Sequence, residues 1–318
     1  MNGIWVDPVP NLIIGDVKAY AETVSVTSIR IPGYWIHKLG SSVEVASPPQ
    51  AGEKLIYSLH GGGYIQGSAH PTDIMATIPR GFLKSVESVH RVFALEYRLS
   101  SGEPPTTVNP FPAALLDAIA GYNYLVNVIG FAPLDIIICG DSAGGNLALA
   151  LTRYLVENQT SSEVKLPTPP GGMLLLSPWT DLSDSNDQPG SSMFRNGRTD
   201  ILDAGQLVIQ AKTFLGPHGP GASKTNRYVS PACKCPSLEI NFVGFPRTFI
   251  IVGDAEMLLD QIKTLHQRMA KDLGPGDGVG ENKGMVRYLE APDAVHGFLL
   301  FEPERSSTLK EIADWIAA

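Results

Sequence analysis

The chain has 318 residues, of which 43% are hydrophobic and 18% are charged. This length supports a large core within one α/β domain, and the composition excludes a disordered chain. The formal net charge of −8, without a basic stripe, argues against a nucleic-acid partner. No apolar run approaches the roughly 20 residues of a membrane-spanning helix, and the N-terminus lacks the pattern of a signal peptide.

Short β-branched runs alternate with helical patterns from residue 54 onward. The patterns predict strands at residues 54–59, 92–97, 134–139, 173–176, 248–252 and 286–289. They predict helices at residues 112–128, 143–157, 204–215, 258–273 and 308–317. This alternation predicts a mostly parallel central sheet with helices on both faces. Residues 24–31 and 30–38 are expected to add an antiparallel edge.

Two segments depart from the alternation. Residues 181–228 begin with a stretch rich in Ser and Asp and contain one predicted helix, so we expect an insertion that covers a site. Residues 274–284 are rich in glycine and are expected to form a surface loop. Neither an internal repeat nor a linker divides the chain. The sequence therefore predicts a single domain over residues 1–318, with a cap.

The three cysteines indicate neither a disulfide framework nor a metal site. Cys139 lies in an apolar run, where it is expected to be a small buried residue. Cys233 and Cys235 are two residues apart, and no second pair or histidine follows at zinc spacing. We expect no metal, no organic cofactor and a reducing, cytoplasmic location.

A reactive serine is predicted where one strand meets one helix. Residues 140–144 read GDSAG, which fits the G-x-S-x-G turn between a buried strand and a helix. In this turn glycines avoid collisions with neighbouring backbone, and the helix N-terminus favours negative charge beside Ser142. Ser142 is therefore the candidate nucleophile.

An oxyanion site is predicted after the strand at residues 54–59. His60 is followed by three glycines, which let backbone N–H groups turn inward and approach a ligand. Gly62 and Gly63 are expected to supply two donors, and Ala143, the residue after the nucleophile, a third. His60 itself is expected to make structural hydrogen bonds.

The chain order Ser, acid, His indicates the base and leaves two candidates for the acid. Of seven histidines, His296 follows the predicted strand nearest the C-terminus, so it is the candidate base. Asp254 and Glu256 both follow the strand at residues 248–252. Either carboxylate could orient the imidazole.

Together these motifs resemble the hormone-sensitive lipase family of α/β-hydrolases. The matching segments are HGGG at 60–63, YRL at 97–99, PFPAAL at 110–115, GDSAGGN at 140–146, SPWTD at 177–181 and SP at 230–231. The resemblance implies the α/β-hydrolase fold and a cap built from about residues 1–50 and 181–228.

The resemblance also bears on the triad acid. Where the family reads D-P-L-x-D, its first aspartate falls on Glu256 and its second on Asp260. Glu256 is therefore favoured, and Asp260 is expected to be structural or to begin a helix. The missing proline and the longer loop before His296 leave Asp254 as the alternative acid.

These observations predict a serine carboxylester hydrolase that uses water and acts on small esters with short to medium acyl chains. Candidates for an apolar pocket wall are Tyr34, Trp35, Met193, Phe194, Leu207, Val208 and Phe214. The alternatives are an acyltransferase, amidase or lactonase with the same triad, or a non-catalytic small-molecule receptor on the same fold. A homodimer could form through an edge strand or a surface helix, but no residue pattern identifies an interface.

Overall fold

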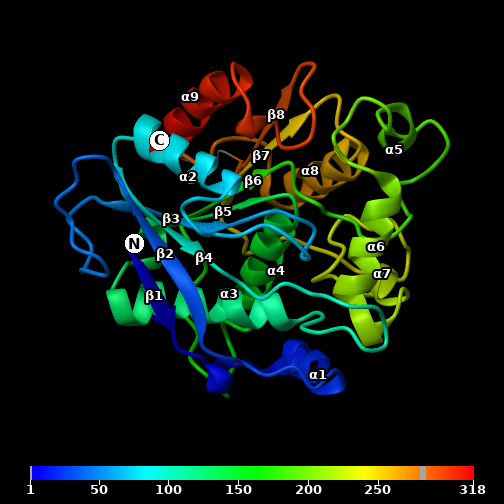
Figure 1. Cartoon of the computed structure of the whole chain (residues 1–318), viewed down its shortest axis with the longest axis horizontal. Helices are drawn as coiled ribbons and strands as arrows, with labels where there is room; N and C mark the ends of the chain where they lie inside the picture. Colours follow the sequence, from blue (N-terminus) through cyan, green and yellow to red (C-terminus); the bar gives the residue numbers. More distant parts are fainter. Residues whose placement is uncertain (1, 280–283) are drawn as a thin grey trace.

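A single eight-stranded sheet forms the centre of the computed structural model, which describes residues 2–279 and 284–318. The strand order is β1-β2-β4-β3-β5-β6-β7-β8, and Figure 1 shows the sheet at the core with helices around it. The strands are β1 (Gly3–Val6), β2 (Ile31–His37), β3 (Lys54–Leu59), β4 (Val89–Leu95), β5 (Ile136–Asp141), β6 (Gly172–Leu176), β7 (Arg247–Gly253) and β8 (Val286–Ala291).

Helices surround the sheet. They are α1 (Gly15–Thr23), α2 (Thr77–Ser85), α3 (Ala113–Asn123), α4 (Ala143–Glu157), α5 (Ser192–Arg195), α6 (Ala204–Leu215), α7 (Ala222–Thr225), α8 (Leu259–Leu273) and α9 (Glu304–Ala317). Short 3-10 turns lie at Pro10–Leu12, Ile74–Ala76, Pro133–Asp135, Gly216–His218 and Phe298–Leu300. In the described part of the chain, no helix is long and apolar enough to cross a membrane.

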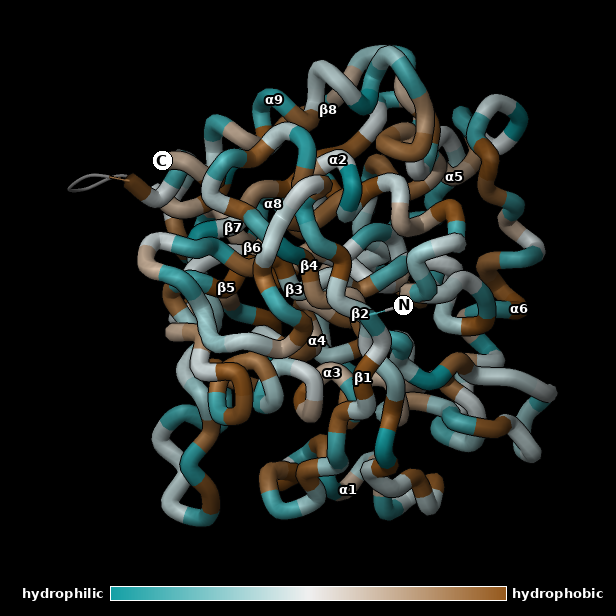
Figure 2. The backbone as a smooth tube through the Cα atoms, turned by 60° about the vertical axis from the view of Figure 1, so that its left-hand side comes forward, coloured by the Kyte–Doolittle hydropathy of each residue, from teal (hydrophilic) through white to brown (hydrophobic). Residues whose placement is uncertain are grey.

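Two apolar layers hold the helices on the sheet. The strands from β3 and β4 through β8 pair in parallel, whereas β1 and β2 pair antiparallel at one edge. Side chains of α2 and α9 pack on one face, and those of α3, α4 and α8 pack on the other. In Figure 2 hydrophobic segments are frequent along the central strands. The predicted fold, a mostly parallel sheet covered on both faces, is confirmed.

The antiparallel edge differs in part from the expectation. Strand β2 lies within the predicted 30–38 segment, but residues 24–30 form no strand, and β1 occupies the edge instead. The amide of Val26 bonds the Ala21 carbonyl at the end of α1, and the Arg98 guanidinium bonds the Thr27 carbonyl at 3.0 Å. These contacts turn the β-branched segment around the helix end, so it cannot join the sheet.

Helix α2 was not predicted because its sequence contains Pro79 and Gly81. The proline lies in the first turn, where a missing N–H is tolerated. A Cβ atom on Gly81 would approach Leu309 of α9 to 2.8 Å, so this glycine allows the two helices to pack closely.

One predicted helix also differs, and one predicted loop is only partly described. The predicted helix 112–128 is α-helical only to Asn123 and continues as a π-helix over Tyr124–Ile129. The loop predicted at 274–284 lies partly outside the described residues.

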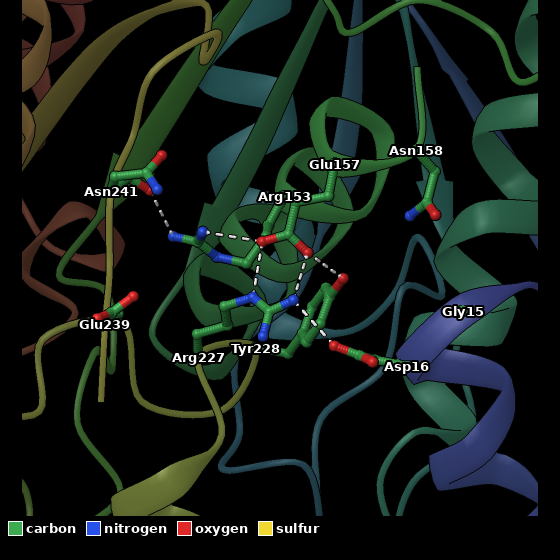
Figure 3. Close-up of a pocket in the computed structure, with 9 residues that line it drawn as sticks. All are labelled: Gly15, Asp16, Arg153, Glu157, Asn158, Arg227, Tyr228, Glu239 and Asn241. Atoms are coloured by element: carbon green, nitrogen blue, oxygen red, sulfur yellow. Dashed lines mark hydrogen bonds and ion pairs between the residues drawn. The ribbon is translucent and has the colours of Figure 1, made fainter. Parts of the chain in front are cut away.

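Ion pairs connect the N-terminal segment to the C-terminal end of α4 (Figure 3). Arg227 contacts Asp16 of α1 at 2.9 Å and Glu157 of α4 at 2.7 Å. Tyr228 donates a hydrogen bond to Glu157. These residues line a polar cavity of about 490 Å³. Because α4 begins beside Ser142 and ends at Glu157, this cavity lies roughly 20 Å from the serine along the helix.

A buried ion pair lies beside the antiparallel edge. Arg91 of β4 and Glu53 are both fully buried, and their Nε–Oε1 distance is 2.9 Å. The Arg91 guanidinium also lies over the rings of Trp35 and Phe131, at 4.9 and 5.1 Å. Loss of one charge would leave the other buried without compensation.

We expect Glu53→Gln to lower the free energy of unfolding by about 3–5 kcal/mol. The matched control is Asp135→Asn, which breaks the partly exposed Lys54–Asp135 pair and should cost less than about 1 kcal/mol. Urea unfolding monitored by circular dichroism measures both. Equal shifts in the two variants would show that the buried pair contributes no more than the surface pair.

Candidate active site

Ser142 lies in the sharp turn between β5 and α4, with φ of +51°. Its backbone is held by hydrogen bonds from its N–H to the Leu176 carbonyl and from the Trp179 N–H to its own carbonyl, at 3.0 and 2.9 Å. A Cβ atom on Gly144 would lie 2.0 Å from the Leu59 carbonyl oxygen. Glycine is therefore required where α4 begins against β3.

Three side chains from separate loops form one line of hydrogen bonds. His296, which follows β8, has its Nε2 2.9 Å from Ser142 Oγ. Its Nδ1 lies 3.1 Å from Glu256 Oε2, in the loop after β7. With Nδ1 protonated toward the carboxylate, Nε2 is free to accept the serine proton. The structure thus brings Ser142, Glu256 and His296 together.

Glu256 is fully buried, and its oxygen that does not face His296 also accepts hydrogen bonds. Oε1 accepts hydrogen bonds from the Ser177 hydroxyl at 2.5 Å and from the Gly253 N–H at 2.6 Å. Asp254 is exposed, and its carboxylate accepts from the Asp293 N–H at 2.7 Å. Of the two predicted acids, only Glu256 is hydrogen-bonded to the imidazole.

Asp260 has a different position from the triad. It lies in the first turn of α8, where its carboxylate accepts from the Ser192 N–H at 2.8 Å. This placement agrees with the structural role expected for it.

The charges around the imidazole favour its protonated form. Burial lowers the pKa of His296, but the hydrogen bond and charge of Glu256, followed by the charges of Asp200 and Asp141, outweigh burial and raise it. Burial raises the pKa of Asp141 to about 7, against the opposing effects of His296 and a backbone bond from Gly61. The site therefore stabilises the imidazolium that forms during proton transfer.

The glycine-rich loop after β3 takes a conformation that side chains would prevent. Gly62 and Gly63 have φ of +109° and +60°. A Cβ atom on Gly63 would lie 2.2 Å from the amide oxygen of Gln210 in α6. His60 is buried, with its Nδ1 2.7 Å from the Gly61 carbonyl oxygen. The position of His60 agrees with its expected structural role, and the donor role of the glycines stays a prediction.

Asn146 is a site residue whose importance the sequence did not reveal. Its Oδ1 accepts from the Tyr64 hydroxyl at 2.8 Å, and its Nδ2 donates to the carbonyls of Trp179 and Val229. Asn146 thereby joins helix α4, the residue after the glycine-rich loop and the two chain segments that flank the insertion. The motif at 140–146 includes this asparagine, but its partners lie far away in sequence.

The two pocket candidates in β2 differ in their surroundings. Trp35 is 1% exposed and packs against Phe93, with ring centroids 4.9 Å apart. It is a core residue between the sheet and α3, which corrects its expected place in a pocket wall. Tyr34, on the other face of the strand, contacts the ring of His70.

The pocket candidates in the insertion differ in how far their side chains are exposed to solvent. Phe214 is buried, with its ring stacked on Tyr64 at 3.7 Å, and Leu207 is also buried. Phe194 and Val208 are 62% and 52% exposed. Met193 is partly buried against the core.

Among the described residues, neither a group of metal ligands nor a disulfide lies at the site. Within residues 2–279 and 284–318, no group of three or more His, Cys, Asp or Glu side chains could hold a metal ion. Cys139, Cys233 and Cys235 are free thiols.

The comparisons with known proteins agree with this geometry. A family model described as the alpha/beta hydrolase fold matches residues 56–300, a range that contains Ser142, Glu256 and His296. An acetyl-hydrolase of Streptomyces hygroscopicus is 30% identical over 254 residues, which cover 80% of this chain and 71% of that protein. An esterase of Acinetobacter venetianus is 28% identical over 247 residues, which cover 77% of this chain and 69% of that protein.

Solved structures give the same result. A hormone-sensitive lipase from a metagenome library superposes with a TM-score of 0.67 and 28% identity, covering 90% of this chain and 80% of that one. EstE5, in a crystal soaked with p-nitrophenyl butyrate, superposes with a TM-score of 0.66 and 28% sequence identity. The match covers 91% of this chain and 82% of that one. This chain belongs to the α/β-hydrolase fold family and, within it, to the esterases of the hormone-sensitive lipase family.

Proposed function

We propose that this protein, a carboxylesterase-type serine hydrolase, cleaves small esters with short to medium acyl chains at Ser142. The observation that carries the proposal is the line of hydrogen bonds from Ser142 Oγ through His296 to Glu256. A serine hydroxyl beside an imidazole that is oriented by a buried carboxylate is the arrangement that activates a nucleophile.

In the first half-reaction, Ser142 Oγ bonds to the acyl carbon while its proton passes to His296 Nε2. Negative charge then lies on the former carbonyl oxygen, which the N–H groups of Gly62, Gly63 and Ala143 would stabilise. The bond between the acyl carbon and the alkoxy oxygen breaks, and the departing alcohol takes the proton from His296. An acyl-enzyme remains on Ser142.

In the second half-reaction, water attacks the acyl carbon and gives a proton to His296. The carboxylic acid leaves when the Ser142 oxygen regains that proton, which restores the free enzyme. Glu256 stays ionised throughout, keeps Nδ1 protonated and stabilises the imidazolium.

The proposed cap consists of about residues 1–50 and 181–228 on a single domain over residues 1–318. In support, α6 packs on the glycine-rich loop through the stacked rings of Phe214 and Tyr64. In the N-terminal part, β1 and β2 belong to the central sheet, and Asp16 of α1 contacts Arg227 roughly 20 Å from Ser142 along α4. The support for a cap at the site therefore comes from the insertion. A cap over the site limits the room for the acyl group.

The preference for small esters has two further supports. Two apolar side chains of the insertion, Phe194 and Val208, are exposed, and the proposal assigns them to the wall of the acyl pocket. The similar proteins include one named acetyl-hydrolase and one whose crystal was soaked with p-nitrophenyl butyrate, and both names refer to short acyl groups.

A cytoplasmic location is also proposed. It is supported by the three free thiols, because a reducing compartment keeps cysteines in that form.

We expect wild-type protein to hydrolyse p-nitrophenyl acetate and butyrate faster than esters with acyl chains of about twelve carbons or more, because the cap restricts the acyl site. Release of p-nitrophenol measures the rates. Ser142→Ala should lose activity by about 10⁴-fold or more. Retained activity in Ser142→Ala would exclude this mechanism. Product analysis with a short alcohol added separates hydrolysis from acyl transfer.

The two carboxylates after β7 can be distinguished directly. Glu256→Gln should lower kcat by about 10⁴-fold, because an amide donating to Nδ1 favours the tautomer whose Nε2 is protonated and cannot accept the serine proton. The matched control is Asp254→Asn, which removes a charge two residues away and should keep most activity. Steady-state kinetics at pH 8 measures both. The reverse pattern would assign the acid role to Asp254.

A further inference from the structure

One carboxylate of the insertion connects the two loops that carry the acid and the base. Asp200 lies between α5 and α6, within the insertion. Its Oδ1 accepts a hydrogen bond from the His296 backbone N–H at 2.8 Å. Its Oδ2 accepts from the Met257 N–H at 2.7 Å, directly after Glu256. A single side chain is thus bonded to the backbone of both triad loops.

A second residue of the same segment holds the acid loop from its other side. The Asn196 side-chain amide donates to the Glu256 carbonyl at 2.8 Å. The Asp200 N–H in turn donates to the Asn196 carbonyl at 2.9 Å, which keeps the two side chains in one turn. Residues 196–200 therefore bond both the C=O and the N–H of the single peptide group that joins Glu256 to Met257.

The loops after the neighbouring strands β7 and β8 are already bonded to each other through the Asp293 N–H and the Asp254 carboxylate, and through the Ala255 N–H and the Ala294 carbonyl. Asp200 adds a connection from the insertion, at His296 itself and at the residue after Glu256. The hydrogen bond between Glu256 and His296, 3.1 Å long, forms only if the loops after the paired strands β7 and β8 hold these two side chains next to each other. Hydrogen bonds to an ionised carboxylate are stronger than those between neutral groups. Asp200 accepts two such bonds, one from each loop, and so restricts the spacing between Glu256 and His296.

We infer that Asp200 is a positioning residue for the hydrolase reaction, which sets the distance between Glu256 and His296 by bonding both of their loops. The inference rests on the proposed function of the triad. It assigns a part of the cap to the assembly of the triad, in addition to covering the substrate.

Because Asp200 is charged, it affects the pKa of His296, and this effect distinguishes its proposed role from a purely structural one. The charged groups that act on the His296 imidazole are Glu256, Asp200 and Asp141, and all three favour its protonated form. His296 acts as a base only when it is neutral, so kcat/KM rises as pH increases through its pKa. Removing the Asp200 charge should lower that pKa and move the rise to lower pH.

The test is Asp200→Asn, assayed with p-nitrophenyl butyrate from pH 5 to 9. We expect kcat to fall by about 10- to 100-fold with little change in KM, and the acid limb of kcat/KM to move to lower pH. Titration of active sites with a phosphonate ester corrects for unfolded protein. Both effects together support the inference.

The matched control is Asp203→Asn, which removes the same charge three residues away. Asp203 caps α6 by accepting from the Gln206 N–H, and asparagine caps helices equally well. This variant should keep the wild-type kcat and acid limb. If Asp200→Asn behaved like Asp203→Asn in both, the inference would be wrong. Activity in Ser142→Ala would instead overturn the proposed function.

If Asp200→Asn does not fold, Asp200→Glu provides the same test. The added methylene retains the charge but displaces the two oxygens, so we expect a lower kcat with the acid limb at its wild-type pH. An unchanged kcat in this variant would contradict the positioning role.

Discussion

The backbone of Ser142 lies in the left-handed region, with φ of +51°, and the rest of the site depends on the packing that holds it there. Such a conformation costs a non-glycine residue about 1–3 kcal/mol. It persists because α4 is buried along most of its length and begins against β3, where Gly144 has no side chain. The consequence is a serine oxygen that projects from the end of the sheet toward His296.

The parallel sheet provides the common edge at which the triad meets. Strands β5, β7 and β8 run in the same direction, so the residues that follow them leave the sheet at the same end. This arrangement brings Ser142, Glu256 and His296 near one another. The Ser177 hydroxyl then donates to Glu256, and the Asp200 carboxylate of the insertion accepts from the His296 N–H. Catalytic geometry and cap structure are therefore coupled.

Several parts of the fold could be predicted because their signals are local. The turn at Ser142, the glycine-rich loop after β3 and the apolar strands each occupy a short, continuous stretch. Other parts could not be predicted in this way. Helix α2 contains Pro79 and Gly81, whose tolerance depends on position in the helix and on the neighbouring α9. The β-branched residues 24–30 favoured a strand, but bonds to α1 and Arg98 prevent one.

The sequence by itself determined which strand-to-helix turn carries the nucleophile and which histidine follows the last strand, because short motifs and chain order define both. Chain order left Asp254 and Glu256 open, since they lie two residues apart in the same turn, and the family resemblance favoured Glu256. Only the tertiary structure showed which of the two carboxylates lies beside His296. Ser177 and His296 meet Glu256 in a buried position, whereas Asp254 turns outward to the Asp293 N–H. These partners lie about 40 to 80 residues away in sequence, and only the folded sheet brings them together.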